Sequence, residues 1–326
     1  MMSSPEVGVL QELDRCQRFL IAMHVTPDGD SGGSALALGL ALRQMGRQVD
    51  WVAWDAMPAR IKFLPSSGEV LCWTQVDLNH YDCVVAVDCA NSGRLRAPEA
   101  LWDGHRAVIN IDHHPGNPGF GTINWVDPSA SSTGEMVTRL FQAAGWSMSL
   151  SEALCLFTAI TTDTLSFRQV NTTLSTLAAI HWIIDRSGLD MNEANQLIWD
   201  RRTPGEVKFL GWALTAMELS PDGRFAWVGV TRATMRQFGV DDSAVDTVVH
   251  HFLTIEGVEV AFMVKEAEPT GTVKVSWRGR QPWNVGDIAA RFGGGGHAYA
   301  AAAPLNASLE DALARVKSYL GSLAHG

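Results

Sequence analysis

The amino-acid sequence predicts an α/β protein, with an N-terminal, doubly wound and mainly parallel sheet and a smaller C-terminal α/β domain. Three observations support this prediction. Apolar runs of strand length alternate with helical patterns over residues 19–163. Acidic residues or histidines stand directly after three of these runs. The breaker residues Pro204 and Gly205 then precede a second series of strand and helix patterns.

The first repeat of this pattern is a strand, a loop and a helix. Apolar residues 19–23 predict a buried strand, and a helix is expected over 31–45. His24, Asp28 and Asp30 lie in the loop between them. In an open α/β sheet, such a loop lies at the carboxyl end of its strand, where ligands bind. Mixed nitrogen and oxygen donors suit an ion such as Mn²⁺ better than a zinc-thiolate site, but the Pro-Asp-Gly stretch is equally consistent with a simple turn.

Repetition of the pattern favours a metal site over a turn. Later apolar runs lead to charged residues at Asp88, at Asp112-His113-His114 and at Asp163. Because the carboxyl ends of parallel strands meet at one edge of a sheet, these side chains are expected to lie together. Their carboxylates would repel one another there unless cations lay between them.

The rest of the chain shows the same alternation of elements. Helices are expected over residues 8–20, 131–145, 149–163, 172–184 and 192–199, and strands over 48–54, 82–88, 106–112 and 124–128. After the breaker residues, a helix is expected over 206–218, strands over 224–231, 258–265 and 272–278, and a short helix over 284–291. The expected domain boundaries are 1–187, a helical linker over 188–205, and 206–326.

The ordered motifs resemble those of the DHH phosphoesterases, a family named for the three residues at positions 112–114. The glycine run 293–296 followed by His297 resembles the signature of the DHH-associated C-terminal domain. The resemblance implies a catalytic domain before the linker, a substrate-binding domain after it, and an active site in the cleft between them. The length is most similar to the nanoRNase subgroup, whose members degrade very short RNA and dephosphorylate 3'-phosphoadenosine 5'-phosphate (PAP).

Three positions differ from the usual family pattern. Leu165 stands where glycine usually follows the Thr-Asp-Thr motif, Gly116 where serine or threonine is commoner, and Ala302 where glycine usually ends the C-terminal motif. None of the three is an expected metal ligand. The differences therefore bear on substrate preference more than on catalysis.

The resemblance implies two bound divalent ions, with Mn²⁺ expected and Mg²⁺ or Co²⁺ as alternatives. One ion would be held by His24 and Asp28, the other by Asp30, His113 and Asp163, and both by a bridging Asp88. Two such ions can share a hydroxide that attacks phosphorus, and they can stabilise both the attacking and the leaving oxygen.

Three further residues have implied roles in catalysis. Asp112 would orient a histidine, His114 would face the substrate phosphate or leaving oxygen, and Arg94 would clamp the scissile phosphate. Simpler interpretations remain open. Asp112 can be a strand-end cap, His114 a third metal ligand or a packed side chain, and Arg94 a solvated loop residue.

Two groups of residues are expected to bind the substrate. Ser31 and Ser34 lie where a helix N-terminus can meet a phosphate, although both are also ordinary capping residues. In the C-terminal domain, a terminal phosphate would be bound by Arg278, Gly294, Gly295, Gly296 and His297. A flexible loop is the alternative for the glycine run.

Composition limits the expected partners. A net charge of −10 argues against binding of long duplex nucleic acid. Residues 271–297 carry four basic residues and one acidic residue, a local charge of +3 that suits capture of a terminal phosphate. No apolar run approaches the roughly 20 residues of a membrane span, and no secretory signal is visible. The five scattered cysteines predict reduced thiols in a cytoplasmic protein.

The predicted function is therefore that of a metal-dependent hydrolase. We expect a phosphodiesterase that degrades very short oligonucleotides, RNA or DNA, and linear dinucleotides such as pApA and pGpG to mononucleotides, and that converts PAP to AMP. No membrane partner is expected, and assembly as a homodimer is left open. The alternatives are a cyclic dinucleotide phosphodiesterase and a non-catalytic nucleotide-sensing protein of the same fold. The second alternative would require the loss of a metal ligand, and none is missing.

Overall fold

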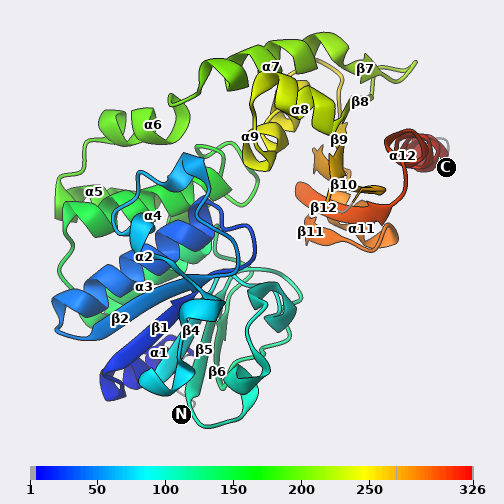
Figure 1. Cartoon of the computed structure of the whole chain (residues 1–326). Helices are drawn as coiled ribbons and strands as arrows, with labels where there is room; N and C mark the ends of the chain where they lie inside the picture. Colours follow the sequence, from blue (N-terminus) through cyan, green and yellow to red (C-terminus); the bar gives the residue numbers. More distant parts are fainter. Residues whose placement is uncertain (1–4, 269, 325–326) are drawn as a thin grey trace. The chain divides into compact units, whose positions relative to one another are not determined.

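The computed structural model describes residues 5–268 and 270–324 of the chain (Figure 1). The described residues group into two compact units, with the boundary between Arg201 and Arg202. The region predicted as a linker, 188–205, contains helix α6 (Met191–Trp199) and the start of α7 (Pro204–Ala216). Among the described helices, none combines the length and the apolar character that a bilayer span requires.

The N-terminal unit is built on a six-stranded sheet in which every pair of neighbours is parallel, so the predicted fold class is confirmed. The strands are β1 (Arg18–Ala22), β2 (Gln48–Ala53), β3 (Leu71–Cys72), β4 (Cys83–Val87), β5 (Ala107–Asp112) and β6 (Ile123–Val126). Their order is β3-β2-β1-β4-β5-β6. The direction of progression therefore reverses between β1 and β4, and the loops after these two strands leave the sheet on either side of a switch point, where ligands bind in such sheets.

Helices cover one face of this sheet, and short turns cover the other. The helices are α1 (Pro5–Arg15), α2 (Gly29–Gln44), α3 (Thr133–Ala144), α4 (Leu150–Asp163) and α5 (Leu174–Ser187), with α2, α3 and α4 side by side in Figure 1. They pack with strand residues such as Phe19 and Ile21. The opposite face is covered by 3₁₀ turns at Trp73–Gln75, Leu78–His80, Ser92–Leu95 and Glu99–Trp102. The predicted helix over 8–20 is wrong at its end, because β1 already begins at Arg18 and takes the apolar residues that follow.

Glycines bring α2, α3 and α4 into close contact. A methyl group on Gly33 would lie 2.3 Å from the carbonyl oxygen of Cys155, and one on Gly29 would lie 2.2 Å from Oγ1 of Thr162. A methyl group on Gly134 of α3 would lie 2.5 Å from an α4 side chain. Residues with a Cβ cannot approach so closely, so these positions fix the spacing of the three helices.

The C-terminal unit contains a second six-stranded sheet, of mixed direction and with strand order β11-β12-β10-β9-β8-β7. Its strands are β7 (Glu218–Leu219), β8 (Phe225–Val230), β9 (Val260–Ala267), β10 (Thr272–Gly279), β11 (Gly295–His297) and β12 (Ala300–Asn306). One face packs against α11 (Val285–Arg291) and α12 (Leu309–Ala324). The other packs in part against α7, α8 (Arg232–Phe238), α9 (Asp242–Asp246) and α10 (Val249–Phe252). Part of the glycine run is thus an edge strand rather than a loop.

An ion cluster, of which Lys265 is the buried member, joins α9 to this sheet. Lys265 and Lys274 stand directly opposite each other on β9 and β10. Their Nζ atoms lie 2.9 and 2.7 Å from the two carboxylate oxygens of Asp246. Burial would raise the pKa of Asp246, but the two ammonium groups outweigh it and hold the pKa below its usual value. The carboxylate thereby offsets a repulsion between like charges across the strands.

We predict opposite effects for one substitution at two helical glycines. Gly33→Ala should lower the free energy of unfolding by about 1–3 kcal/mol, because the added methyl group meets a backbone carbonyl that cannot move aside freely. Gly8→Ala is the matched control. A methyl group there would meet no described atom within 4 Å, so the higher helix propensity of alanine should add about 0.5–1 kcal/mol. Urea unfolding of both variants measures the difference, and equal effects would contradict the packing argument.

Candidate metal centre

The carboxyl edge of the N-terminal sheet gathers the residues that the sequence singled out. His24 follows β1, Asp88 follows β4, and Asp112 ends β5. Asp28 caps the N-terminus of α2, and Asp163 is the last residue of α4. Their ligand atoms form three groups, each within 4.8 Å: His24-Asp28-Asp88, Asp30-His113-Asp163 and Asp88-Asp112-His114.

Asp88 belongs to the His24-Asp28-Asp88 group and also faces the Asp30-His113-Asp163 group. Its Oδ2 lies 3.4 Å from Nε2 of His24, and its Oδ1 lies 3.6 Å from Nε2 of His113. These distances exceed those of a good hydrogen bond, about 2.7–3.2 Å. They fit ligand atoms that each lie about 2.0–2.2 Å from a shared ion. Asp88 adopts φ +55°, in the left-handed region that aspartate tolerates better than most residues.

Backbone carbonyls fix the tautomers of two histidines. Nδ1 of His24 lies 2.7 Å from the carbonyl oxygen of Val25, and Nδ1 of His113 lies 3.3 Å from that of Ala130. A carbonyl oxygen only accepts, so each Nδ1 carries the proton and donates it. In the neutral form of either ring, the Nε2 lone pair would point toward the carboxylates, as a metal-ligating histidine requires.

Asp30 joins the metal groups to a second helix. Its Oδ2 accepts a hydrogen bond of 2.7 Å from the backbone N–H of Thr133, and its Oδ1 accepts one of 2.8 Å from that of Gly134. These are first-turn groups of α3, so the carboxylate also satisfies that helix terminus. Ser34, predicted to meet phosphate, donates a hydrogen bond of 3.1 Å to Asp30 Oδ1. Ser31 is buried, and its hydroxyl makes no hydrogen bond within the described part of the chain.

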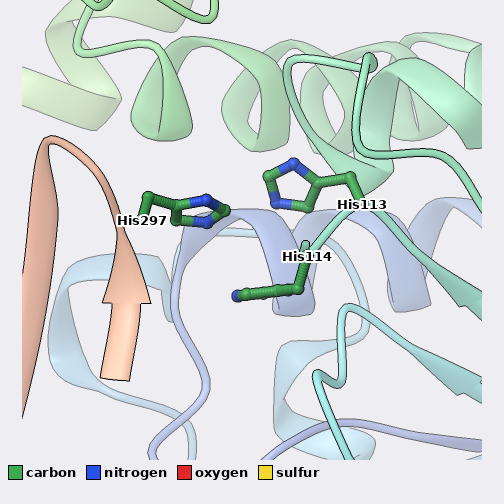
Figure 2. A group of neighbouring side chains, drawn as sticks. All are labelled: His113, His114 and His297. Carbon is green, nitrogen blue, oxygen red and sulfur yellow. The ribbon is translucent and has the colours of Figure 1, made fainter. Parts of the chain in front are cut away.

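Asp112 pairs with His114. Nδ1 of His114 lies 2.8 Å from Oδ1 of this fully buried carboxylate. The other oxygen, Oδ2, accepts a hydrogen bond of 2.6 Å from Nδ2 of Asn117. The His113 and His114 rings lie side by side, with centroids 5.0 Å apart (Figure 2). The pairing leaves Nε2 of His114 as the ring atom that can meet a substrate.

Arg94 borders the same edge. Its backbone oxygen accepts a hydrogen bond of 2.8 Å from the N–H of Val25, and its Nη2 lies 3.2 Å from Nδ1 of His24. Because Nδ1 already donates to the Val25 carbonyl, the two groups are neighbours rather than a donor and acceptor pair. The guanidinium places a positive charge beside the His24 ring.

The carboxylates perturb one another in the absence of ions. Burial and the neighbouring carboxylates, chiefly that of Asp88, raise the pKa of Asp30 well above its usual value. Burial also opposes ionisation of Asp88, but the three imidazoles around it outweigh burial and hold its pKa low. Burial lowers the pKa of His24, yet Asp28 and Asp88 outweigh this and raise it to about 9. A divalent ion would therefore displace a proton from His24 at neutral pH.

Two of the predicted phosphate-binding residues of the C-terminal unit lie on the strands that flank β12. Arg278 of β10 and His297 of β11 are both paired with Ala300 of β12, so they stand on the same face of the sheet. Figure 2 also labels His297. The glycines have a packing role as well. A methyl group on Gly294 would lie 2.1 Å from a β12 carbonyl oxygen, and one on Gly296 would lie 2.5 Å from another.

Sequence reasoning missed three residues that hold site residues in place. Asn171 donates from Nδ2 to Oδ2 of Asp163 at 3.2 Å and to the carbonyl oxygen of Ser131 at 2.8 Å. Asn117 holds Asp112, as described above. His250, which the sequence suggests is a structural or surface residue, accepts a hydrogen bond of 3.2 Å from Nε of Arg278. Asparagines in loops carry no periodic signal, and the distant pairings are visible only in three dimensions.

Comparison with known proteins shows the family to which the chain belongs. The DHH family N-terminal domain matches residues 18–160, and the DHHA1 domain matches residues 227–322. The chain is 33% identical over 297 residues to the bifunctional oligoribonuclease and PAP phosphatase NrnA of Thermus thermophilus, covering 91% of this chain and 87% of that protein. This protein belongs to the DHH family. It is thus a phosphoesterase of the family that the motifs predicted, and such enzymes depend on divalent metals.

Of two further relatives of this DHH protein, one is also named NrnA and the other is named for a different activity. A second NrnA, from Bacillus subtilis, is 28% identical over 88% of this chain and 89% of its own length. Cyclic-di-AMP phosphodiesterase GdpP of Geobacillus thermodenitrificans is 27% identical over 89% of this chain but only 45% of its own length. In fold, an exopolyphosphatase-related protein from Bacteroides fragilis matches with a TM-score of 0.85 at 24% identity, over 97% of this chain and 94% of that one.

We predict that Asp88→Asn lowers the number of Mn²⁺ ions bound per chain more than His24→Gln does. A residue shared by two ions disturbs both sites when its charge is lost, whereas His24 faces one group only. Asparagine tolerates the left-handed backbone of this position, so the variant should fold. Metal analysis after dialysis gives the stoichiometry, and circular dichroism checks folding. Retention of full metal content by Asp88→Asn would contradict the bridging position.

Proposed function

We propose that this DHH protein hydrolyses very short oligonucleotides to mononucleotides and converts PAP to AMP. One observation carries the proposal: Asp88 presents its two oxygens to two separate groups of histidine and carboxylate ligands, in a chain related over nine-tenths of its length to an enzyme named for both activities. Two-ion sites of this kind suit displacement at phosphorus.

The donor set fits two divalent ions. His24 and Asp28 would hold one, Asp30, His113 and Asp163 the other, and Asp88 both. Imidazole nitrogen together with carboxylate oxygen suits Mn²⁺, with Mg²⁺ or Co²⁺ as alternatives. When bound, such ions activate a water molecule and neutralise charge on the reacting phosphate.

His114 and Arg94 would act on the substrate directly. Asp112 holds Nδ1–H of His114, so Nε2 is presented in a fixed orientation and can exchange a proton with the leaving oxygen. The buried Asp112 carboxylate stabilises the ring when it is protonated. Arg94, beside His24, would bind a non-bridging oxygen of the phosphate through its N–H groups.

The C-terminal unit would select short substrates. Arg278, His297 and the amides of Gly294, Gly295 and Gly296 are proposed to bind the substrate's terminal phosphate. Capture of a terminal phosphate would favour substrates that carry such a phosphate close to the scissile bond. The acidic net charge of the whole protein also disfavours binding of longer nucleic acid, because it repels the phosphate backbone.

A cyclic dinucleotide phosphodiesterase is the second candidate, favoured by the 27% identity with GdpP. Cyclic dinucleotides have no terminal phosphate. Arg278 would therefore matter for linear substrates and not for cyclic ones. Rates on a linear and on a cyclic dinucleotide distinguish the two functions.

The proposed function predicts a definite substrate order. With Mn²⁺, turnover should be fastest on pApA and pGpG, measurable on PAP, slower on a five-residue RNA, and absent on pyrophosphate. Chelation of divalent ions should abolish activity, and added Mn²⁺ should restore it. Chromatography of the products measures each rate. Full turnover in excess EDTA, or a preference for cyclic di-AMP over pApA, would overturn the proposal.

Arg278→Ala should separate substrate capture from chemistry. Loss of a charge-assisted phosphate contact costs about 1.5–3 kcal/mol, so kcat/KM on pApA should fall roughly 10- to 150-fold. Activity on bis(p-nitrophenyl) phosphate, which has no terminal phosphate, should persist, and bound metal should be unchanged. Arg315→Ala, at an exposed arginine of the same unit outside the basic segment 271–297, is the control and should leave both substrates unaffected. Equal loss on both substrates would place Arg278 in the chemistry or in folding.

A further inference from the structure

Trp54 is an exposed aromatic residue at the carboxyl edge of the N-terminal sheet. It follows β2 directly, and 43% of its surface is exposed, whereas Trp51 of the same strand is fully buried. Trp54 is neither a proposed metal ligand nor one of the site residues predicted from the sequence. A large aromatic ring left in water at a ligand-binding edge is a candidate surface for a flat ligand.

Backbone pairing places Trp54 beside the metal centre. β1 and β2 pair in register as far as Ala22 and Val52, and the N–H of Met23 continues the pairing by donating to Val52 at 3.0 Å. Extended by two residues, this register would set Trp54 opposite His24. The following residue, Asp55, accepts 2.7 Å from the backbone N–H of Thr26, inside the loop that carries the first metal ligands.

Arg96 holds one face of the ring. Its Cζ lies 5.4 Å from the centroid of the Trp54 ring, within the range of a cation–π contact. Arg96 stands two residues after Arg94, which contacts His24 and Val25. Its backbone has φ +46°, and its N–H donates to the carbonyl oxygen of Gly93, so its position is defined by the turn. Trp54 and Arg96 thus each stand within two residues of a group that contacts the His24–Asp28 loop.

We propose that Trp54, backed by Arg96, is the surface on which a nucleobase of the substrate stacks. An aromatic ring offers stacking to every base, and an arginine behind it fixes the ring and attracts the substrate's phosphates. The inference rests on the proposed function, because it requires a nucleotide substrate. It adds a subsite that binds the base, separate from the groups that bind phosphate.

The test compares two exposed tryptophans. Trp54→Ala should raise KM for pApA by about 5- to 100-fold with a smaller change in kcat, as expected for one lost base stack. Trp54→Phe should recover most of the loss. Trp102→Ala is the matched control, because Trp102 is 40% exposed but precedes β5 and lies at the amino end of that strand. It should leave KM unchanged. Bound Mn²⁺ per chain should equal that of the wild type in all three variants.

A substrate without a base makes the test specific. A 5'-phosphorylated dinucleotide with one base removed should be a poorer substrate for the wild type when the stacked base is the missing one. Trp54→Ala should then lose nothing further on that substrate. Unchanged KM for pApA in Trp54→Ala, or an equal additional loss on both abasic dinucleotides, would overturn the inference. Failure of the wild type to cleave any dinucleotide would instead overturn the proposed function.

Discussion

Burial and the neighbouring carboxylates at the carboxyl edge of the N-terminal sheet raise the pKa of Asp30 well above its usual value, so this edge is assembled against desolvation and electrostatic repulsion. The chain offsets the repulsion with groups of positive character. Imidazoles flank Asp88, the N-terminus of α3 donates two N–H groups to Asp30, and the Arg94 guanidinium lies beside His24. Divalent ions would complete the compensation, and the ligand atoms are already spaced to share them. The chemistry and the stability of this unit therefore depend on the same charges.

Holding these charges in place requires rigid helices. The ligands come from the start of α2, the end of α4 and the ends of β1, β4 and β5, and α3 supplies the N–H groups that fix Asp30. Glycines at the contacts between the helices set their spacing, because a Cβ at Gly33 would meet a backbone carbonyl. Leu165, which stands where the family pattern has glycine, adopts φ +47° two residues after Asp163. Strain at this leucine lies beside a proposed metal ligand, in the turn that ends α4.

Polar contacts also organise the C-terminal unit, but around positive charge. On one face of β10, Lys274 meets Asp246 and Arg278 meets His250. Arg278 also donates from Nη1 to the carbonyl oxygen of Trp277 at 2.8 Å, so two contacts fix the plane of its guanidinium. A side chain fixed in advance loses less conformational entropy on binding an anion. This arrangement is consistent with the proposed capture of a terminal phosphate.

The sequence by itself determined the parallel α/β class, the order of the motifs and the identity of the residues that gather at one sheet edge. It could do so because each charged motif directly follows an apolar run, and parallel strands carry their ends to the same edge. Only the tertiary structure decided that Asp112 pairs with His114, that Ser34 is engaged by Asp30, that His250 contacts Arg278, and that Trp54 meets Arg96. These pairs depend on how separate elements pack and on which way each side chain turns. Periodicity reports only the spacing of residues along one element, so it cannot reveal such contacts.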